Sequence, residues 1–256
     1  MEPEQASGSG VRSVRRALDI LSLLTEEQPV VPLRTVVEAT GLPKTTVVRL
    51  VQTLEQYGLL WATEAGYMAG PGLWRWAYLA ASSWQLPPET VDLLRGLVAR
   101  HGETVNLMIR RDVQRVCVAQ QESPRPLRHV VRIGDELPLW AGASSKVLLS
   151  GADDALLSRI ALLSPHGEGH AAQLRAWSDE AERAGFAVSH GERESGLTAV
   201  AVPIRAAGGG VAASLSLSGP SSRMTDDLIA GFTADLLDVS ARIAAEGFDH
   251  PLVPRS

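Results

Sequence analysis

The sequence predicts an α+β protein with a small helical N-terminal domain and a larger domain of mixed helices and strands. Its 256 residues exceed what a single ordinary domain needs, which favours two domains. Apolar residues recur at the spacing of helices up to residue 57, whereas strand-like runs alternate with helical stripes from residue 104 onward. An apolar content of 45% and a charged content of 21% are typical of a folded globular chain.

Residues 11–70 predict three helices followed by a hairpin. The first helix begins near residue 11, and its predicted buried stripe consists of Val14, Ala17, Leu18, Leu21 and Leu24. A second, shorter helix ends at Gly41, because glycine accepts the left-handed conformation of a sharp turn. The third helix is predicted over 43–57, and strands at 59–61 and 67–69 follow it. This order of elements is that of a winged helix-turn-helix.

The third predicted helix has a polar face suited to reading DNA. Its predicted inward residues are Val47, Leu50, Val51 and Leu54. The candidate DNA contacts on this helix are Lys44, Thr45, Thr46, Val48, Arg49 and Gln52, and Arg12 and Arg16 are added from the first helix. A helix start attracts phosphate, and arginine and glutamine have the forked donors that read base edges. Periodicity alone is equally compatible with an ordinary solvated face, but the preceding turn and the following hairpin favour recognition.

Residues 71–88 predict a linker helix, and residues 89–248 predict the larger α+β domain. Its strands are expected at 104–110, 114–120, 127–132, 137–140, 186–190, 197–205 and 211–218. Helices are expected around 91–98 and at 144–150, 153–162, 171–184 and 225–247. We expect one sheet with its helices mainly on one face. Residues 1–10 are expected to be disordered, and residues 252–256 look like the remnant of a cleavable tag.

Composition and charge exclude several classes of protein. The net charge is −5, so a case for DNA binding has to rest on where the charges lie. The sequence lacks both an apolar run of about 18 residues and a signal-peptide core, so we expect a cytoplasmic protein without a membrane span. The single cysteine, Cys117, excludes an intrachain disulfide and fits a reducing compartment.

We expect neither a metal nor another cofactor. The segment 166–170 contains two histidines and a glutamate, but its two glycines predict a loop rather than a helix that presents ligands on one face. The sequence also lacks the nucleophile elbow Gly-x-Ser-x-Gly, the phosphate loop Gly-x-x-x-x-Gly-Lys, the zinc motif His-Glu-x-x-His and a dinucleotide-binding Gly-x-Gly-x-x-Gly after a strand.

Several motifs in a fixed order resemble those of one known family. In the first domain they are Ala17-Leu18-x-Ile20-Leu21, the segment from Gly41 to Leu50, and Leu54-x-x-x-Gly58. In the second they are Gly134-x-x-Leu137-Pro138-Leu139-Trp140-Ala141 with Lys146, Gly185-Phe186-Ala187, Glu192, the segment from Gly196 to Ile204, and the segment from Ser214 to Pro220 with Arg223. Over about residues 11–247 the chain therefore resembles the IclR-type transcriptional regulators, named for the isocitrate lyase regulator.

The resemblance implies a GAF-like second domain with a cupped small-molecule site, in a dimer or tetramer whose ligand alters operator binding. By position, the implied pocket residues are Leu127, His129, Leu137, Trp140, Ala143, Ser144, Ser189, Leu197, Ala199, Ser216 and Ser218. The residues themselves agree in part. Ser144 is expected at a helix start, where a carboxylate can accept N–H bonds, and alternation places the hydroxyls of Ser214, Ser216 and Ser218 on one sheet face.

The sequence departs from the family pattern at four positions. Trp140 stands where the family usually has histidine, and Ser145 where it has glycine. Ser189 and Ala199 stand where some members have an acid or a cysteine. We therefore expect an effector other than the smallest oxo acids, with an aromatic or longer carboxylic acid as the candidate. Trp140 has the alternative role of a core or interface aromatic residue.

Two hypotheses about function follow. The first is a ligand-responsive DNA-binding regulator, a repressor of a catabolic operon, which binds palindromic double-stranded operator DNA as a homodimer or tetramer and takes a small organic acid as effector. The second is a metabolic enzyme whose N-terminal helices serve only for oligomerisation. The missing catalytic motifs leave the enzyme hypothesis little chemistry to use.

Overall fold

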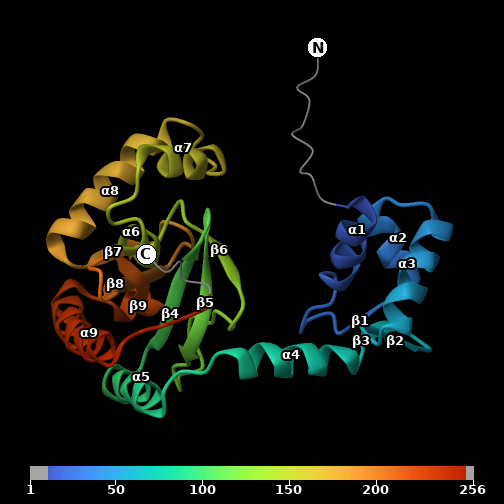
Figure 1. Cartoon of the computed structure of the whole chain (residues 1–256), viewed down its shortest axis with the longest axis horizontal. Helices are drawn as coiled ribbons and strands as arrows, with labels where there is room; N and C mark the ends of the chain where they lie inside the picture. Colours follow the sequence, from blue (N-terminus) through green and yellow to red (C-terminus); the bar gives the residue numbers. More distant parts are fainter. Residues whose placement is uncertain (1–10, 252–256) are drawn as a thin grey trace. The chain divides into compact units, whose positions relative to one another are not determined.

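The computed structural model describes residues 11–251, and its elements are labelled in Figure 1. The chain divides into two compact units between Gln85 and Leu86, and each unit is described by itself. The expected disordered segment 1–10 and the expected tag remnant 252–256 lie outside the described residues.

The first unit contains four helices and a three-stranded antiparallel sheet among its described residues. The helices are α1 (Arg12–Leu21), α2 (Leu33–Thr40), α3 (Lys44–Gln56) and α4 (Gly72–Ser83). The strands are β1 (Val30–Val31), β2 (Leu60–Thr63) and β3 (Gly66–Ala69), in the order β1-β3-β2. The winged helix-turn-helix order is thus present. The sequence missed β1, because two residues are too few to show the alternation by which strands are recognised.

The core of the first unit joins its helices to its small sheet. Its buried side chains are Ile20, Val31, Val36, Val47, Val51, Leu54 and Leu60. The predicted inward stripe of α3 is therefore correct, but that of α1 is wrong in part. Val14 and Leu18 are 56% and 57% exposed, and Ile20 is the buried residue of this helix. The helix ends at Leu21 and turns toward the core only at its C-terminal end, which a periodic stripe cannot reveal.

Three glycines hold the start of α4 against the end of α3. Gly58 follows α3, and its carbonyl accepts a hydrogen bond from the Gly72 N–H at 2.8 Å. A side chain on Gly70 would place its Cβ in steric overlap with the Gly58 oxygen, and one on Gly72 would place it 2.7 Å from the same atom. Backbone segments can approach this closely only where side chains are absent. The wing, α3 and α4 therefore meet at one crowded point.

The second unit is a six-stranded antiparallel sheet with five α-helices and one short 3-10 turn among its described residues. The helices are α5 (Pro88–His101), α6 (Ala143–Leu148), α7 (Asp154–Leu162), α8 (His170–Ala184) and α9 (Asp226–Glu246), and the turn is η1 (Ser221–Arg223). The strands are β4 (Thr104–Arg111), β5 (Gln114–Gln121), β6 (Glu136–Pro138), β7 (Ala187–His190), β8 (Leu197–Arg205) and β9 (Val211–Pro220). Their order in the sheet is β6-β5-β4-β9-β8-β7.

Helices cover both faces of this sheet, so the expectation of helices mainly on one face is wrong. Helices α5 and α9 lie on one side, and α6, α7 and α8 lie on the other (Figure 1). The second group packs through small residues, because Ala143 and Val147 of α6 contact Ala201 of β8. A helix predicted from periodicity shows which of its own faces is buried, but not which side of the sheet it covers.

The predicted strand at 127–132 is also absent. This segment is an irregular connection between β5 and β6, and Leu127 in it is 67% exposed. Thr104 Oγ1 and Arg223 Nη2 donate hydrogen bonds to the carbonyls of His129 and Leu127, so side chains rather than a neighbouring strand satisfy these groups. Of the apolar side chains in this segment, Val131 is buried, whereas Leu127 and Val130 are exposed, so the apolar alternation did not indicate a strand.

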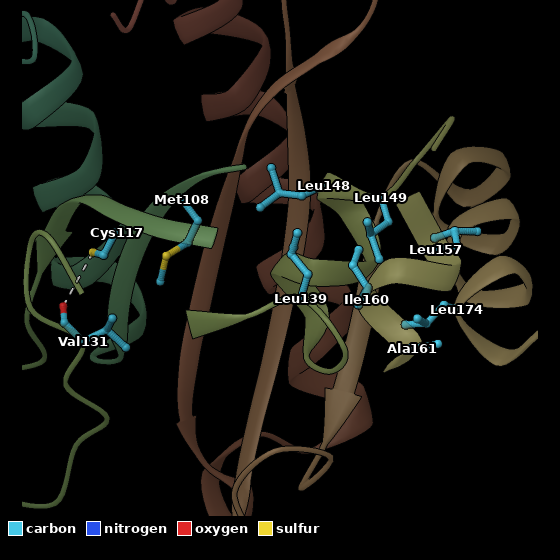
Figure 2. Packing of buried hydrophobic residues seen from close by; sticks show 10 residues of the cluster. All are labelled: Met108, Cys117, Val131, Leu139, Leu148, Leu149, Leu157, Ile160, Ala161 and Leu174. Atoms are coloured by element: carbon cyan, nitrogen blue, oxygen red, sulfur yellow. Dashed lines mark hydrogen bonds between the residues drawn. The ribbon is translucent and has the colours of Figure 1, made fainter. Parts of the chain in front are cut away.

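Figure 2 shows the apolar cluster between β4, β5 and the helices α6, α7 and α8. Met108 and Cys117 come from the two strands, and Leu139 comes from the segment that leads into α6. The Cys117 thiol donates to the Val131 carbonyl at 3.6 Å. This cluster anchors α6 to the sheet and so fixes one wall of the cavity described below. Within residues 11–251, no helix combines the length and apolar character needed to cross a membrane.

The contact at Gly70 generates a stability prediction. Gly70→Ala should lower the free energy of unfolding of the first unit by about 1–3 kcal/mol, because the new methyl group requires a backbone shift. Gly96→Ala is the matched control, since Gly96 lies within α5 and a methyl group added there would meet no atom within 4 Å. It should stabilise the second unit by about 0.5–1 kcal/mol. Urea unfolding followed by circular dichroism measures both, and equal effects would contradict the prediction.

Candidate functional site

Helix α3 presents a polar face to solvent in the first unit. Its buried side consists of Val47, Val51 and Leu54. Of the predicted DNA-contact residues on this helix, Lys44, Thr45, Arg49 and Gln52 are exposed, and Thr46 and Val48 are half-buried. None of the six residues is buried in the core, and the four exposed ones can contact a partner.

The turn before α3 leaves the start of this helix open. Gly41 adopts a left-handed conformation with φ of 63°, and Pro43 precedes the first helical residue. The Pro43 carbonyl accepts hydrogen bonds from the N–H groups of Thr46 and Val47. No side chain caps this helix, so the N–H groups of Lys44 and Thr45 have no helical acceptor. Such a helix start can bind an anion such as a phosphate group.

The basic start of α1 lies near this turn. Arg12 is exposed and Arg16 is half-buried, and both line a shallow hollow between α1 and α2. Thr40 and Leu42, from the turn before α3, line the same hollow. The two predicted arginines thus line the same hollow as the turn that leads into α3, and this is the side on which the sequence predicts contacts with a sugar–phosphate backbone.

The wing tip carries no basic side chain. The turn between β2 and β3 is closed by a hydrogen bond from Thr63 Oγ1 to the Gly66 carbonyl at 2.9 Å, and its exposed charged residue is Glu64. The wing therefore lacks the arginine or lysine that a strongly charged minor-groove contact needs.

A cavity in the second unit lies between the sheet and the start of α6. Nine predicted pocket residues line it, namely His129, Leu137, Ala143, Ser144, Ser189, Leu197, Ala199, Ser216 and Ser218. Register explains how they meet, because Ala199 of β8 pairs with both Ser189 of β7 and Ser218 of β9. The enclosed space is about 40 Å³.

Two predicted pocket residues do not line the cavity. Leu127 points to solvent from the irregular connection after β5, because the strand that would have turned it inward is absent. Trp140 packs against the apolar cluster of α6, α7 and α8, and its ring meets His166 edge to face with centroids 6.1 Å apart. The alternative role of Trp140, as a core aromatic residue, is therefore the correct one.

An ion pair fixes the start of α6 over the sheet. Lys146 Nζ lies 2.5 Å from Glu192 Oε1, donates to the Val188 carbonyl at 2.9 Å, and sits 4.4 Å from the centre of the Trp177 ring. The other carboxylate oxygen of Glu192 accepts the Gly142 N–H at 3.0 Å. We expected the carboxylate of an effector at this helix start. The structure places the carboxylate of Glu192 there instead.

Arg115 of β5 is buried at the edge of the cavity. Its side chain donates to the Ala141 carbonyl at 2.7 Å and to the Ser145 hydroxyl, and Ser145 in turn donates to the same carbonyl at 2.8 Å. Burial lowers the pKa of Arg115 to about 9, and Arg193 acts in the same direction while Glu192 opposes both. The guanidinium therefore remains charged at neutral pH. Within the described chain, Arg115 Nε has no hydrogen-bond partner.

His129 connects the cavity floor to the loop between β7 and β8. Its Nδ1 lies 2.9 Å from Ser218 Oγ, and its Nε2 lies 3.3 Å from an Arg193 nitrogen. Burial, reinforced by Arg193, lowers the pKa of His129 to about 4, so the ring is neutral at pH 7. Because arginine only donates, Nε2 accepts, and the ring proton resides on Nδ1. Ser218 therefore accepts a hydrogen bond from His129.

Sequence reasoning missed seven residues of the cavity wall. They are Asn106, Met108, Arg115, Gly142, Glu192, Arg193 and Glu194. Arg115 follows Gln114 at the start of its strand and stands out less, whereas Asn106 carried a usable signal, since it is a polar residue between Val105 and Leu107. Such a residue needs a partner inside the fold, or a ligand. Arg193 and Glu194 lie in a loop, where charged residues are common and carry no such signal.

The cavity is arranged for binding rather than for covalent chemistry. Ser218 contacts His129, but the nitrogen that faces its hydroxyl is the protonated Nδ1, so His129 cannot take the Ser218 proton as the base of a nucleophilic pair would. Cys117 is buried, and burial raises its pKa to about 12, so it remains a thiol. His166 and His170 stack on aromatic neighbours, and no group of three or more His, Cys, Asp or Glu side chains within residues 11–251 could hold a metal ion.

Comparisons with known proteins match both units. Residues 80–245 match the family model of the bacterial transcriptional regulator IclR C-terminal domain, and residues 13–61 match that of the IclR helix-turn-helix domain. The acetate operon repressor of Salmonella typhimurium is 28% identical over 245 residues, which cover 91% of this chain and 89% of the repressor.

Two solved structures show the same architecture. An IclR-family protein from Rhodococcus sp. is 41% identical, with a TM-score of 0.64 and 99% coverage of both chains. An IclR homolog from Microbacterium hydrocarbonoxydans, crystallised with 4-hydroxybenzoate, is 20% identical with a TM-score of 0.71, and the match covers 91% of this chain and 99% of that one. The second likeness shows a shared fold.

The buried state of His129 generates a prediction about pH. The pKa of this histidine is 6.5 in an unfolded chain and about 4 in the folded protein. Between these values the unfolded chain binds a proton that the folded chain does not, so stability falls as the pH drops from 6.5 toward 4. The loss attributable to His129 is at most about 3 kcal/mol. Comparing wild type with His129→Gln isolates this contribution.

The measurement is urea unfolding of both proteins between pH 7.5 and 4. The difference in the free energy of unfolding should move in favour of His129→Gln as the pH falls, because the variant has no histidine to protonate at this position. Other buried histidines titrate in both proteins and cancel from the difference. Parallel curves for the two proteins would contradict the prediction.

Proposed function

The chain belongs to the IclR family of bacterial transcriptional regulators, and we propose that it represses a catabolic operon by binding a palindromic operator as a homodimer or tetramer. It is a DNA-binding regulator, and the alternative of a metabolic enzyme with an oligomerisation module is not favoured, because the related proteins are regulators. A repressor of this kind acts where the DNA is, which in a bacterium is the cytoplasm.

The exposed face of α3 is the observation that carries the DNA-binding mode. Arg49 and Gln52 extend from it with the planar, forked donors suited to guanine and adenine edges in the major groove. Lys44 and Thr45 stand at the uncapped start of the helix, where backbone N–H groups and a positive side chain suit phosphate. Arg12 and Arg16 extend the phosphate contacts along α1. The net charge of −5 is no obstacle, because binding depends on this local arrangement.

The effector is proposed to occupy the cavity beside α6. Hydroxyls of Ser216 and Ser218 and the amide of Asn106 line its floor, and Leu137 and Leu197 supply apolar walls. A small organic acid with one anionic end suits this lining. The Microbacterium hydrocarbonoxydans protein, which has the same fold, was crystallised with 4-hydroxybenzoate, an acid of this general kind.

The homodimer is proposed to use apolar side chains of α4. Trp74 and Tyr78 are 80% and 73% exposed, and Trp76 and Leu79 are each more than half exposed. Leu73, also expected on this surface, is half-buried and lines a shallow apolar hollow with Trp61 of the wing. Large apolar side chains gathered on one exposed helix are typical of an interaction surface. Two copies of the unit would present two recognition helices to a palindrome.

Substitutions on α3 test the DNA-binding mode. Arg49→Ala should weaken operator binding by about 1–3 kcal/mol and relax the sequence preference at one position, because a base-reading fork is lost. Lys44→Ala should weaken binding to all sequences and lower the salt slope by about one, because a phosphate contact is lost. Gel shifts with the DNA upstream of the chain's own gene, at several salt concentrations, measure both.

Arg242→Ala serves as the control for charge alone, since Arg242 is an exposed arginine of α9 in the other unit. It should leave operator affinity and salt slope unchanged. If Arg49→Ala and Lys44→Ala also leave both quantities unchanged, the recognition helix is not α3.

The oligomer is tested by sedimentation. The wild-type protein should be a dimer or larger at micromolar concentration, and Trp74→Glu with Tyr78→Glu should shift it toward the monomer, because two charges would then be buried in the proposed interface. Leu228→Glu, at an exposed leucine of α9, is the control and should leave the mass unchanged. A wild-type monomer at this concentration would contradict the proposal.

A further inference from the structure

Two buried polar atoms on the cavity wall lack hydrogen-bond partners within the described chain. One is the Nε of Arg115, which can only donate, and the other is the Oδ1 of Asn106, which can only accept. Arg115 and Asn106 are 5% and 1% exposed, and both line the same cavity. Buried polar atoms in folded proteins almost always have partners, so two orphans of opposite kind at one cavity point to an absent ligand.

The charges around the cavity leave Arg115 without a carboxylate. Lys146 holds Glu192 at 2.5 Å, and Arg193 lies 3.3 Å from Glu194, so each acid already has a cation. No carboxylate of the described residues lies within ion-pair distance of Arg115, whose bonds go instead to a carbonyl and to the Ser145 hydroxyl. A buried guanidinium held by neutral groups alone is an unbalanced positive charge, and an anion would balance it.

Ser218 supplies a second donor at the cavity floor. Its oxygen accepts hydrogen bonds from Asn106 Nδ2 at 3.3 Å and from His129 Nδ1 at 2.9 Å. With both acceptor positions used, the Ser218 hydroxyl proton is left to donate, and it has no acceptor among the described residues. The floor therefore presents the Ser218 hydroxyl as a donor and the side-chain oxygen Oδ1 of Asn106 as an acceptor. The Arg115 Nε–H, which has no partner among the described residues, lies on the wall of the same cavity.

We propose that Arg115 is the anion anchor of the cavity and that the ligand is a monocarboxylate carrying a hydroxyl group. The carboxylate lies on Arg115 and Ser218, and the hydroxyl donates to Asn106 Oδ1. This inference rests on the proposed effector-binding role of the cavity and specifies its chemistry. A single charge is specified because one cation is unbalanced, and a hydroxyl because an acceptor without a donor remains.

The test is thermal unfolding of the full chain against ligand concentration, with sodium chloride at matched ionic strength as the reference. The small probes are glycolate, acetate, which lacks the hydroxyl, and glycolamide, which lacks the charge. The larger probes are 4-hydroxybenzoate, benzoate and 4-hydroxybenzamide. In one series or the other, wild type should be half-maximally stabilised by the hydroxy acid at a concentration at least ten-fold below that of either matched compound.

Variants assign the response to residues. Arg115→Gln keeps an amide donor for the Ala141 carbonyl but has no charge, and it should remove the preference for the acid over the amide. Arg115→Lys keeps the charge and should restore part of that preference. Asn106→Ala should remove the preference for the hydroxylated acid over the plain acid. Arg159→Gln, at an exposed arginine of α7 paired with Asp112, should respond as wild type does.

Several outcomes would overturn the inference. If no acid in either series stabilises wild type more than chloride does, the cavity has no anion anchor. If Arg115→Gln unfolds at a much lower temperature yet keeps the preference for the acid, Arg115 is a structural residue. If acids with and without the hydroxyl act equally on wild type, Asn106 does not read a donor.

These outcomes are distinguishable from a failure of the proposed function. Thermal unfolding reports ligand binding without DNA, whereas gel shifts with the wild-type protein report operator binding without ligand. An operator-binding protein whose response to acids is independent of Arg115 would overturn this inference alone. A protein that binds the hydroxy acid through Arg115 but does not bind DNA would overturn the proposed function and leave the anchor intact.

Discussion

The wall of the cavity depends on the ion pair between Lys146 and Glu192. Lys146 reaches Glu192 from α6 and holds it at 2.5 Å, and the same carboxylate accepts the Gly142 N–H. This arrangement ties the start of α6 to the loop after β7 and so forms the cavity wall. It also withholds Glu192 from Arg115, which then depends on neutral partners. The Lys146–Glu192 ion pair therefore holds the cavity wall in place and leaves Arg115 without a carboxylate partner.

The two faces of the sheet differ in the polarity of their buried side chains. On the face toward α6, strand β9 places Ser214, Ser216 and Ser218 opposite Met108, Asn106 and Thr104 of β4, so polar groups are buried in a row. On the other face, alternate residues such as Leu215 and Leu217 are fully buried and apolar. The apolar face supplies the packing that stabilises the domain. The polar face can therefore be reserved for a ligand.

Much of the fold was readable from the sequence, because its elements have strong local signals. The inward stripe of α3, the turn at Gly41 and strand β8 from Leu197 to Arg205 were all predicted. Features that depend on distant partners were not. The exposure of Leu18, the short strand β1 and the placement of helices on both sheet faces arise from tertiary packing. The cavity was predicted through its serines, whereas Arg115 was missed because its role depends on which cation Glu192 already holds.

The crowded glycines at the end of α3 have a mechanical consequence. Gly58, Gly70 and Gly72 bring three backbone segments together without any side chain between them, so the contact is made by backbone atoms alone. This contact joins α4, which carries the exposed aromatic side chains, directly to the end of α3. We therefore expect a rotation of α4 to move α3 with it. In the proposed dimer, the way in which two α4 helices meet would accordingly set the spacing of the two α3 helices on an operator.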